Sequence, residues 1–353
     1  MSELPSLTIA GRRIGSIDPP YIIAELSGNH NGDLNRAMRL LEVAADCGVD
    51  AVKLQTYTAD TITIDHGGPE FVINNGLWRG RQLYDLYQEA STPWEWHEAL
   101  FARGRELGVA VFSSPFDPSA VIFLERLGTP AFKIASFEIV DLPLIRLAAA
   151  TGKPIIMSTG IANLSEIDEA VGAARAVGDG GLALLHCVSA YPTPFEDSNL
   201  RTIPHLSEAF GVTAGLSDHT MSTAAAVAAV ALGARVIEKH FTLARADGGP
   251  DSSFSLEPNE LKRLVEDCRD AWSALGRVHY DLKGSEQQSR VFRRSLYVVA
   301  DVAAGEEMTR HNVRSIRPGF GLAPKYLPDV VGRRAARGLR RGEPLAWDML
   351  ANA

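Results

Sequence analysis

The segment from Val212 to Thr242 reads VTAGLSDHTMSTAAAVAAVALGARVIEKHFT and contains one complete strand–helix–strand unit. Its first part, Val212–Leu216, is short and largely apolar, as a strand covered on both faces of a sheet should be. Its last part, Arg235–His240, has an apolar centre at Val236-Ile237 and ends in Glu238-Lys239-His240. The Ala-rich stretch Thr223–Leu232 between them predicts a helix. Two strands joined through a helix lie parallel in one sheet, so the segment predicts a βαβ unit.

The same alternation extends in the N-terminal direction from this segment and gives eight units in all. The other strands are predicted at Tyr21–Glu25, Ala51–Gln55, Val109–Ser113, Ala131–Ala135, Pro154–Ser158 and Leu182–Cys187. Further helices are predicted, among others, at Asn35–Cys47, Trp94–Leu107, Ser119–Arg126, Leu164–Val177 and Pro258–Leu275. Eight such units over about 250 residues predict a (β/α)8 TIM barrel.

Both ends of the chain depart from this alternation. At the N-terminus, LTIAGRRIG (residues 7–15) predicts a β-hairpin. After Gly276 the alternation stops, and the polar stretch GSEQQS (residues 284–289) is typical of a linker. We therefore predict a barrel domain over residues 1–280, a linker over 281–291 and a small, loop-rich domain over 292–353.

Composition limits the classes of partner and compartment. The 353 residues are 46% hydrophobic and carry a net charge of −8, which argues against a nucleic-acid or anionic-membrane partner. The three cysteines form no CxxC pair, so a reducing cytoplasm is the expected compartment. The longest apolar run, Ala224–Leu232, is too short to span a membrane, and no signal peptide is expected.

Polar or charged side chains stand at the carboxyl end of every predicted strand, where TIM barrels build their active sites. Packing alone would not place such groups at all eight positions. His219 and His240 follow neighbouring strands, and two neutral imidazoles there can share a divalent ion while leaving positions open for water and substrate. The alternative is that each is an ordinary hydrogen-bonded histidine.

An anion site is predicted beside this pair. Lys53 and Lys133 supply positive charge, and short hydroxyl donors are predicted to complete a phosphate cradle. These hydroxyls belong to Ser114, Ser136, Ser158 and Ser217. Neither a P-loop nor a GxGxxG motif is present, so a nucleotide is not indicated. The alternative is a structural ion pair of the lysines with Glu25, Glu138 or Glu238.

Two carboxylates are candidates for general acid/base work. Glu25 and Glu238 lie on the first and last strands, which become neighbours when a barrel closes. Neutralisation of Lys53 and Lys239 is the alternative, and Glu25 is the preferred catalytic candidate. Cys187 lies beside His186, but we interpret it as a packing residue on a buried strand rather than a thiolate nucleophile.

Taken together, the strand-end motifs resemble those of the sialic acid synthase family. The resemblance covers essentially the whole chain, with the motifs in family order. They are Ala24-Glu25, NHNG (29–32), VKLQ (52–55), FSSPFD (112–117), KIASFE (133–138), KPIIMSTG (153–160), YPTP (191–194), GLSDHT (215–220), IEKHFT (237–242) and RPG (317–319).

This resemblance implies a TIM barrel followed by a C-terminal SAF (antifreeze-like) domain. It implies a domain-swapped homodimer, in which the small domain of one subunit caps the barrel of the other. The implied enzyme is a transferase that joins phosphoenolpyruvate (PEP) to a 2-acetamido sugar aldehyde, releases phosphate and requires a divalent metal, commonly Mn²⁺ or Mg²⁺.

The resemblance also implies a role for each site residue. His219 and His240 fall on the metal, and Glu25 falls at the acid/base position. PEP is expected to contact Lys53, Ser114, Lys133, Ser136, Ser158 and Ser217. The sugar is expected to contact Gln55, Ser189, Tyr191, Asp251 and, from the partner subunit's SAF domain, the residue equivalent to Arg317.

Two departures from the neuraminic acid branch bear on the substrate. Ser189 replaces an Asn of that branch, and the loop LWRGR (residues 77–81) lacks an Asn that helps to hold PEP. That loop, GGPDSSFSLEP (248–258) and SRVFRRSLYVV (289–299) are similar to the pseudaminic acid branch. The expected acceptor is therefore 2,4-diacetamido-2,4,6-trideoxy-altropyranose, giving pseudaminic acid.

Other functions stay open at this point. One alternative is an N-acetylneuraminate or legionaminic acid synthase, using N-acetylmannosamine or a di-acetamido mannose. Another is a PEP-dependent synthase of a phosphorylated aldose, which would need a second phosphate cradle. The third is a non-catalytic sugar-binding barrel, which would need no metal beside an acid/base.

Overall fold

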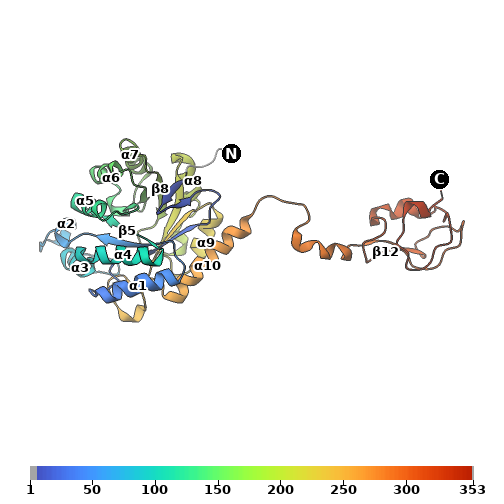
Figure 1. The fold of residues 1–353 in the computed structure, drawn as a ribbon, viewed down its shortest axis with the longest axis horizontal. Helices are drawn as coiled ribbons and strands as arrows, with labels where there is room; N and C mark the ends of the chain where they lie inside the picture. The colour runs from blue at the N-terminus through green and yellow to red at the C-terminus, as the bar shows by residue number, and fades with distance from the viewer. Residues whose placement is uncertain (1–5, 352–353) are drawn as a thin grey trace. The chain divides into compact units, whose positions relative to one another are not determined.

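The computed structural model describes residues 6–351, and the chain divides after Gly276 into two compact units (Figure 1). Two antiparallel strands, β1 (Leu7–Ile9) and β2 (Arg12–Ile14), form the N-terminal hairpin. They turn at Ala10 and Gly11, whose φ angles are 48° and 81°. Gly11 accommodates this left-handed conformation without strain, so the hairpin predicted for residues 7–15 is confirmed.

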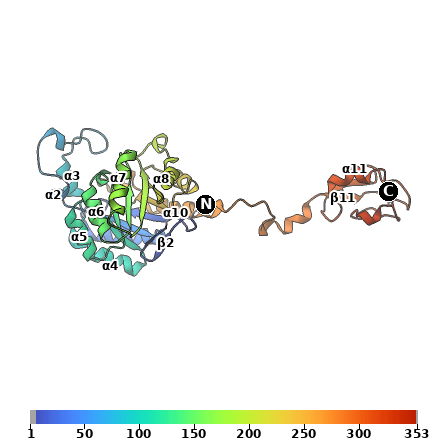
Figure 2. The same cartoon turned by 90° about the horizontal axis from the view of Figure 1, so that it is seen from above.

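A closed barrel of parallel strands forms the first unit, as predicted (Figures 1 and 2). In order around the barrel its strands are β10 (Val236–His240), β3 (Tyr21–Glu25), β4 (Ala51–Thr56), β5 (Ala110–Pro115), β6 (Phe132–Ile134), β7 (Ile155–Ser158), β8 (Leu182–Cys187) and β9 (Thr213–Asp218). Closure pairs β10 with β3, so that His240 lies opposite Glu25. Each predicted strand overlaps one of these eight strands.

Helices connect the strands and cover the outside of the barrel (Figure 1). They are α1 (Leu34–Asp46), α2 (Ala59–Ile62), α3 (Leu83–Ala90), α4 (His97–Leu107), α5 (Pro118–Arg126), α6 (Leu142–Ala150), α7 (Leu164–Arg175), α8 (Thr202–Phe210), α9 (Ala224–Ala231) and α10 (Pro258–Leu275). Local chemistry sets several of their ends. Asn163 caps α7 by accepting hydrogen bonds from the Ser165 and Glu166 amides, and Gly108 ends α4 at a φ of 71°.

Two apolar layers stabilise the barrel. The larger layer fills the space between strands and helices, with buried residues such as Leu40, Ile145 and Leu264. The smaller layer fills the inside of the barrel, where Phe112 and Ile156 pack in one cluster with Ile9 of the hairpin. The hairpin therefore closes the amino-terminal end of the barrel, and the carboxyl end is left for the site.

The second unit contains little regular structure. It has one antiparallel pair, β11 (Ser295–Val298) and β12 (Val313–Ile316), and one short helix, α11 (Leu327–Val330). Its own core includes Leu296, Met308 and Leu345. The predicted linker, residues 281–291, contains the 3-10 helix η7 (Gly284–Glu286) and most of η8 (Gln288–Phe292).

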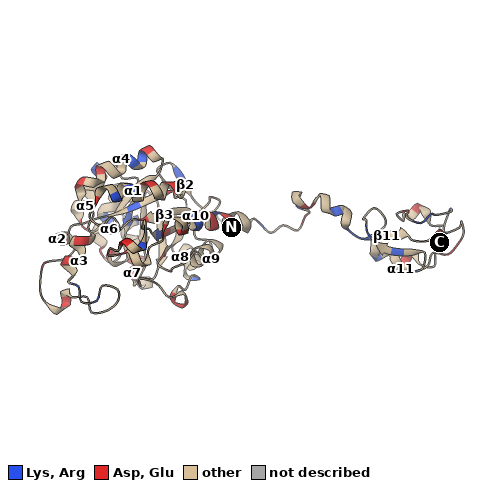
Figure 3. Cartoon of the chain, turned by 90° about the horizontal axis from the view of Figure 1, so that it is seen from below, with Lys and Arg blue, Asp and Glu red and all other residues tan. Residues whose placement is uncertain are grey.

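Acidic and basic side chains are mixed along the outer helices, as on α4 (Figure 3). This intermixing matches the moderate net charge of −8. Within residues 6–351, none of the helices is long and apolar enough to cross a membrane.

Candidate active site

The alternation of side chains along a strand sorts the charged residues at the carboxyl end of the barrel. On β10, Glu238 and His240 share one face, and Lys239 between them faces the other way. Lys239 Nζ lies 2.7 Å from Asp218 Oδ2, and both side chains are buried. This pair joins β9 to β10 behind the site, so it supports the strand ends that carry the inward-facing residues.

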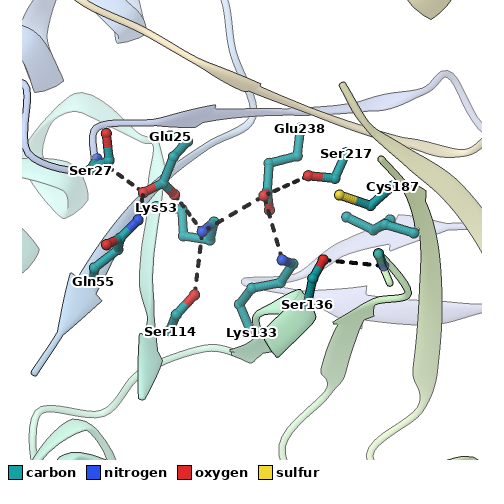
Figure 4. A network of polar contacts seen from close by, with 12 residues as sticks. Glu25, Ser27, Lys53, Gln55, Ser114, Lys133, Ser136, Cys187, Ser217 and Glu238 are labelled. Carbon is teal, nitrogen blue, oxygen red and sulfur yellow. Dashed lines mark hydrogen bonds and ion pairs between the residues drawn. The ribbon is translucent and has the colours of Figure 1, made fainter. Parts of the chain in front are cut away.

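Four buried charged side chains form a network inside the mouth of the barrel (Figure 4). Lys53 Nζ lies 2.5 Å from Glu25 Oε2 and 3.7 Å from Glu238 Oε1. Lys133 Nζ lies 3.5 Å from the same Glu238 oxygen. Each lysine has a carboxylate neighbour, so the ion pairs considered as an alternative do form. The positive charges of the two lysines balance the negative charges of the two glutamates, which lowers the free-energy cost of burying them.

The two carboxylates of this network have opposite electrostatic environments. Burial raises the pKa of Glu25. Burial acts on Glu238 in the same direction, but Lys133 and Lys53 outweigh it and lower the pKa of Glu238. Glu238 is thus the stable anion between the lysines, whereas Glu25 takes up a proton more readily. Neighbouring carboxyls separated in this way can serve as an acid/base and an electrostatic stabiliser.

The pKa values of the two lysines are also shifted in opposite directions. Burial lowers the pKa of Lys53, but Glu238 and Glu25 outweigh this effect and raise it. For Lys133, burial prevails and the pKa is lowered. Lys133 therefore has less counter-charge than Lys53, and an incoming anion would stabilise its charged form.

Hydroxyl groups surround this network. Ser114 Oγ accepts a hydrogen bond from Lys53 Nζ at 3.3 Å, and Ser217 Oγ donates to Glu238 Oε1 at 3.2 Å. Ser136 Oγ accepts from the Gly160 amide at 3.2 Å. The buried hydroxyls of Ser158 and Ser189 have no hydrogen-bond partner among residues 6–351. Since a buried hydroxyl costs free energy until it is paired, these two groups are suited to a polar ligand.

The histidine pair lies next to the network. The ring centroids of His219 and His240 are 5.4 Å apart. His219 Nδ1 lies 2.9 Å from the Val188 carbonyl oxygen, and His240 Nδ1 lies 3.2 Å from Ser27 Oγ. A carbonyl only accepts, so His219 donates from Nδ1, and its neutral form carries a lone pair on Nε2. Burial lowers the pKa of His219, but Cys187 outweighs this effect and raises it. Burial lowers the pKa of His240 well below its usual range, which keeps that ring neutral.

These features fit a metal ion. A ligating histidine ordinarily binds through one ring nitrogen and donates the other N–H to a carbonyl or another acceptor, as His219 does here. Within the part of the chain that the structure describes, no cluster of three or more His, Cys, Asp and Glu side chains is placed to hold a metal. The pair would therefore act as two protein ligands, with water and substrate completing the shell.

The residues predicted to hold the sugar lie in two places. Tyr191 packs on the histidines, with ring centroids 4.3 Å from His219 and 6.2 Å from His240. Asp251 Oδ2 accepts from the Gly28 amide at 3.3 Å, and burial raises its pKa. Gln55 donates to Glu25 Oε1 at 3.0 Å, which joins it to the acid/base candidate. Arg317 belongs to the second unit.

Three side chains at the mouth received no catalytic or binding role from the sequence. Glu138 has a buried, unpartnered Oε2, and burial raises its pKa to about 7. Its position in the motif KIASFE (residues 133–138) is the sequence feature that could have indicated a role in the site. Phe254 and Trp78 form an aromatic wall with Tyr191, but neither follows a strand end. Only the folded loops bring them to the site.

Cys187 is buried beside the histidine pair. Its sulfur lies 4.0 Å from His219 Nδ1. Burial alone would raise the pKa of the thiol, but His219 outweighs this effect and lowers it to about 7. The side chain is buried at the end of β8, as expected, but its lowered pKa was not expected from the interpretation of Cys187 as a packing residue.

A closed parallel barrel with buried acid, base and cation groups at its carboxyl end defines a TIM-barrel enzyme. The model of the NeuB family matches residues 40–280, and that of the SAF domain matches residues 293–351. The chain belongs to the NeuB family, and its second unit contains a SAF domain. Both were expected from the motif resemblance, which is confirmed.

Named relatives cover nearly the whole chain. A pseudaminic acid synthase of Helicobacter pylori is 45% identical over 94% of this chain and 98% of its own length. An N,N'-diacetyllegionaminic acid synthase of Campylobacter jejuni is 38% identical over 91% of this chain and 97% of its own. The crystal structure of an N-acetylneuraminic acid synthetase from Leptospira borgpetersenii has a TM-score of 0.72 and 33% identity, over 81% of this chain and 95% of that chain.

Proposed function

We propose that the chain is a pseudaminic acid synthase, condensing PEP with 2,4-diacetamido-2,4,6-trideoxy-altrose to give pseudaminic acid and phosphate. The observation that carries the proposal is the histidine pair with its Nδ1 atoms engaged, beside a buried network of two lysines and two glutamates. The choice of acceptor is supported by the higher identity to the pseudaminic acid synthase, 45%, than to the legionaminic acid synthase, 38%.

PEP occupies the lysine and serine cluster in this proposal. Its phosphate and carboxylate are anions, and Lys133 lacks full counter-charge. The buried hydroxyl of Ser158, which has no hydrogen-bond partner among the described residues, offers a donor for these anions. Charge-assisted hydrogen bonds from lysines and hydroxyls are the usual means of holding such groups. Ser114 of β5, Ser217 of β9 and Ser136 at the start of the 3-10 helix η3 (Ser136–Glu138) would complete the cradle.

A divalent ion, Mn²⁺ or Mg²⁺, would be held by the Nε2 atoms of His219 and His240 and would polarise the acceptor aldehyde. The protein supplies what that ion requires. Val188 sets the tautomer of His219, and burial keeps His240 neutral. The Tyr191 ring lies against both imidazoles and limits the access of water.

In this proposal Glu25 transfers a proton and Glu238 stabilises positive charge. Carbon 3 of PEP attacks the aldehyde carbon, and cationic character develops at carbon 2. The ionised Glu238 stabilises that charge from between the lysines. Water adds at carbon 2 and gives one proton to the Glu25 carboxylate, and Glu25 passes this proton to the oxygen of the former aldehyde. The bond between carbon 2 of the tetrahedral intermediate and the bridging phosphate oxygen then breaks. The hydroxyl proton at carbon 2 leaves with phosphate as the keto group forms, and the lysines stabilise the leaving anion.

The acceptor lies on the side of Gln55, Ser189, Tyr191 and Asp251 in this proposal. Arg317 of the partner subunit completes the pocket through its SAF domain, so that the working form is a domain-swapped homodimer. The family resemblance supports this arrangement. We place the reaction in the cytoplasm, which three free, buried cysteines support.

A panel of acceptors with PEP and Mn²⁺ tests the proposal through phosphate release. The panel contains the altro-configured di-acetamido sugar, its manno- and gluco-configured counterparts, and N-acetylmannosamine. The proposal predicts the highest kcat/KM with the altro sugar. A higher value with a manno-configured sugar would make the chain a legionaminic or neuraminic acid synthase. Sugar binding without any phosphate release would contradict the enzymatic assignment.

A further inference from the structure

A loop after β4 carries an aromatic side chain to the mouth of the barrel. The segment between α2 and α3 stands out from the barrel in Figure 2. Its residues Val72 and Gln82 form an antiparallel bridge, and Ile73 N donates to the Arg81 carbonyl oxygen at 2.9 Å. The loop is therefore a closed hairpin-like structure, and Trp78 lies near its tip.

Trp78 is fixed by a contact across the mouth. Its Nε1–H donates to the Pro250 carbonyl oxygen at 2.8 Å, which joins the loop after β4 to the loop after β10. Pro250 is itself held closely against Gly28, where an added Cβ would lie 2.8 Å from Pro250 Cγ. Since Asp251 also accepts from the Gly28 amide, the acceptor of the indole N–H has a defined position.

The indole ring extends an aromatic wall that begins at the histidine pair. Trp78 lies 5.6 Å from Tyr191 and 6.3 Å from Phe254, measured between ring centroids. Tyr191 lies 4.3 Å from His219, and Phe254 lies 4.9 Å from His240. Trp78 is thus the outer member of the wall, one ring further from the histidines than Tyr191 and Phe254.

The chemistry of this wall is apolar at its outer end. The one polar atom of Trp78 is already engaged by Pro250, and Phe254 has none. A substrate hydroxyl placed against these rings would lose its hydrogen bonds to water without replacement, whereas a methyl group would gain contact. The wall would thus distinguish acceptors by the polarity of the group that lies against it.

We propose that Trp78 is a specificity-determining residue that selects an acceptor presenting a methyl group, rather than a hydroxyl, to the aromatic wall. This inference rests on the proposed function and names the feature of the acceptor that is read. The proposed sugar carries three methyl groups, and two of them lie away from the acetamido group at carbon 2, which is next to the aldehyde. One is its deoxy terminus at carbon 6, and the other belongs to its acetamido group at carbon 4.

Two analogues separate these sources. One carries a hydroxyl at carbon 6 and keeps both acetamido groups; the other carries a hydroxyl at carbon 4 and keeps the deoxy terminus. The kcat/KM of each is measured by phosphate release, relative to the parent sugar, for wild type, Trp78→Phe and Trp78→Ala. Wild type should prefer the parent over one analogue by roughly 10- to 100-fold, as pockets that read one small group do.

Trp78→Ala should lower that preference at least about tenfold, and Trp78→Phe should retain most of it. If Trp78→Ala loses the preference for the parent sugar over one analogue, the methyl group missing from that analogue is the one that Trp78 contacts. Trp94→Ala is the matched control, because Trp94 is also half-buried and donates Nε1–H to a carbonyl, that of Tyr57 at 3.3 Å. Its ring stacks on Phe123 outside the wall, so its loss should leave the preference unchanged.

The possible results test the role of Trp78 separately from the proposed function on which it rests. An active Trp78→Ala enzyme with the wild-type preference for the parent over both analogues would overturn the role of Trp78 alone. Failure of wild type to release phosphate with any acceptor would overturn the proposed function and this inference with it. A changed preference in Trp94→Ala to the same extent would also contradict the assignment, since general loosening would then explain the effect.

Discussion

At the residue scale, the site separates two carboxyls that have the same chemistry in solution. Glu238 lies between Lys53 and Lys133, and their charges lower its pKa against the effect of burial. Glu25 contacts Lys53 alone among the lysines, so burial prevails and raises its pKa. The position of each carboxyl relative to the lysines therefore supports the proposed acid/base role of Glu25 and the proposed role of Glu238 as a fixed negative charge.

Glu25→Ala is expected to bind both substrates yet turn over slowly. A positioned acid/base ordinarily contributes about 10²- to 10⁴-fold to a rate, so kcat should fall by that order. KM for PEP should change little if Glu25 acts on a proton rather than on binding. Steady-state phosphate release, with PEP binding by calorimetry, checks both statements. An unchanged kcat would transfer the role to Glu238.

The histidine pair gives a second prediction at this scale. His219→Ala and His240→Ala should each abolish metal-dependent turnover while the circular dichroism spectrum is retained, because each removes one of two protein ligands. Calorimetric titration with Mn²⁺ should show binding to wild type and greatly weakened binding to either variant. Near-normal activity of either variant in chelated buffer would refute the metal assignment.

At the element scale, the prediction from sequence was accurate where local pattern determines structure. Leu182–Cys187 and Pro258–Leu275 were predicted with the bounds that the structure has. The apolar runs are continuous because both faces of these strands are covered, and Pro258 starts its helix at the first turn, where no amide is needed. The strand predicted at Tyr21–Glu25 also has the bounds of β3, and the other strand bounds differ by one or two residues, as at β5 and β9.

Contacts between distant elements could not be predicted. Trp78 meets Pro250 across 172 residues of sequence, and no periodic pattern encodes that contact. The partners of the site lysines were similarly open, because strand order brings Lys53 near Glu25, Glu238 and Ser114 alike. Sequence placed the charged groups at the strand ends. Side-chain length and the geometry of closure then decided which groups meet.

His97, which is buried between α4 and β4, predicts how the free energy of unfolding depends on pH. His97 begins α4, is fully buried, and lies 2.8 Å from Thr56 Oγ1 of β4. Burial lowers its pKa from 6.5 to about 4, so the unfolded chain binds the proton more readily below pH 6.5. Stability from this group is present above pH 6.5 and is lost as pH falls, by about 3 kcal/mol at pH 4.

His97→Gln should therefore show a smaller loss of unfolding free energy than wild type between pH 6.5 and 4, by about 3 kcal/mol. Urea denaturation at a series of pH values measures this difference. The exposed His205→Gln variant is the control and should follow wild type. Parallel curves for His97→Gln and wild type would show that His97 is not held neutral by the fold.

At the scale of the whole molecule, the chain combines a barrel that holds reacting groups with a small unit that has its own core. The division into a repeating and a non-repeating part was visible in the sequence, because the βα alternation ends near Gly276. The association of subunits was expected from the family resemblance, since no local pattern of residues encodes which barrel a SAF domain caps.

Mixing two inactive variants tests the domain-swapped homodimer. Glu25→Ala and Arg317→Ala should each be nearly inactive alone. After the two are unfolded and refolded together, a swapped heterodimer contains one site with an intact barrel and an intact Arg317, so activity should recover to about a quarter of wild type. Refolding each variant alone is the control. No recovery in a mixture that forms heterodimers would show that each SAF domain serves its own barrel.

The central claim is that this barrel joins PEP to an amino sugar with cleavage of the C–O bond of the phosphate ester. Mass spectrometry of products from PEP labelled with ¹⁸O at its bridging oxygen tests it most directly, with 2,4-diacetamido-2,4,6-trideoxy-altrose as acceptor and Mn²⁺ present. The account predicts a product heavier than the acceptor by one pyruvic acid, and the label in inorganic phosphate. An unchanged acceptor, or ¹⁸O retained in the sugar product, would contradict it.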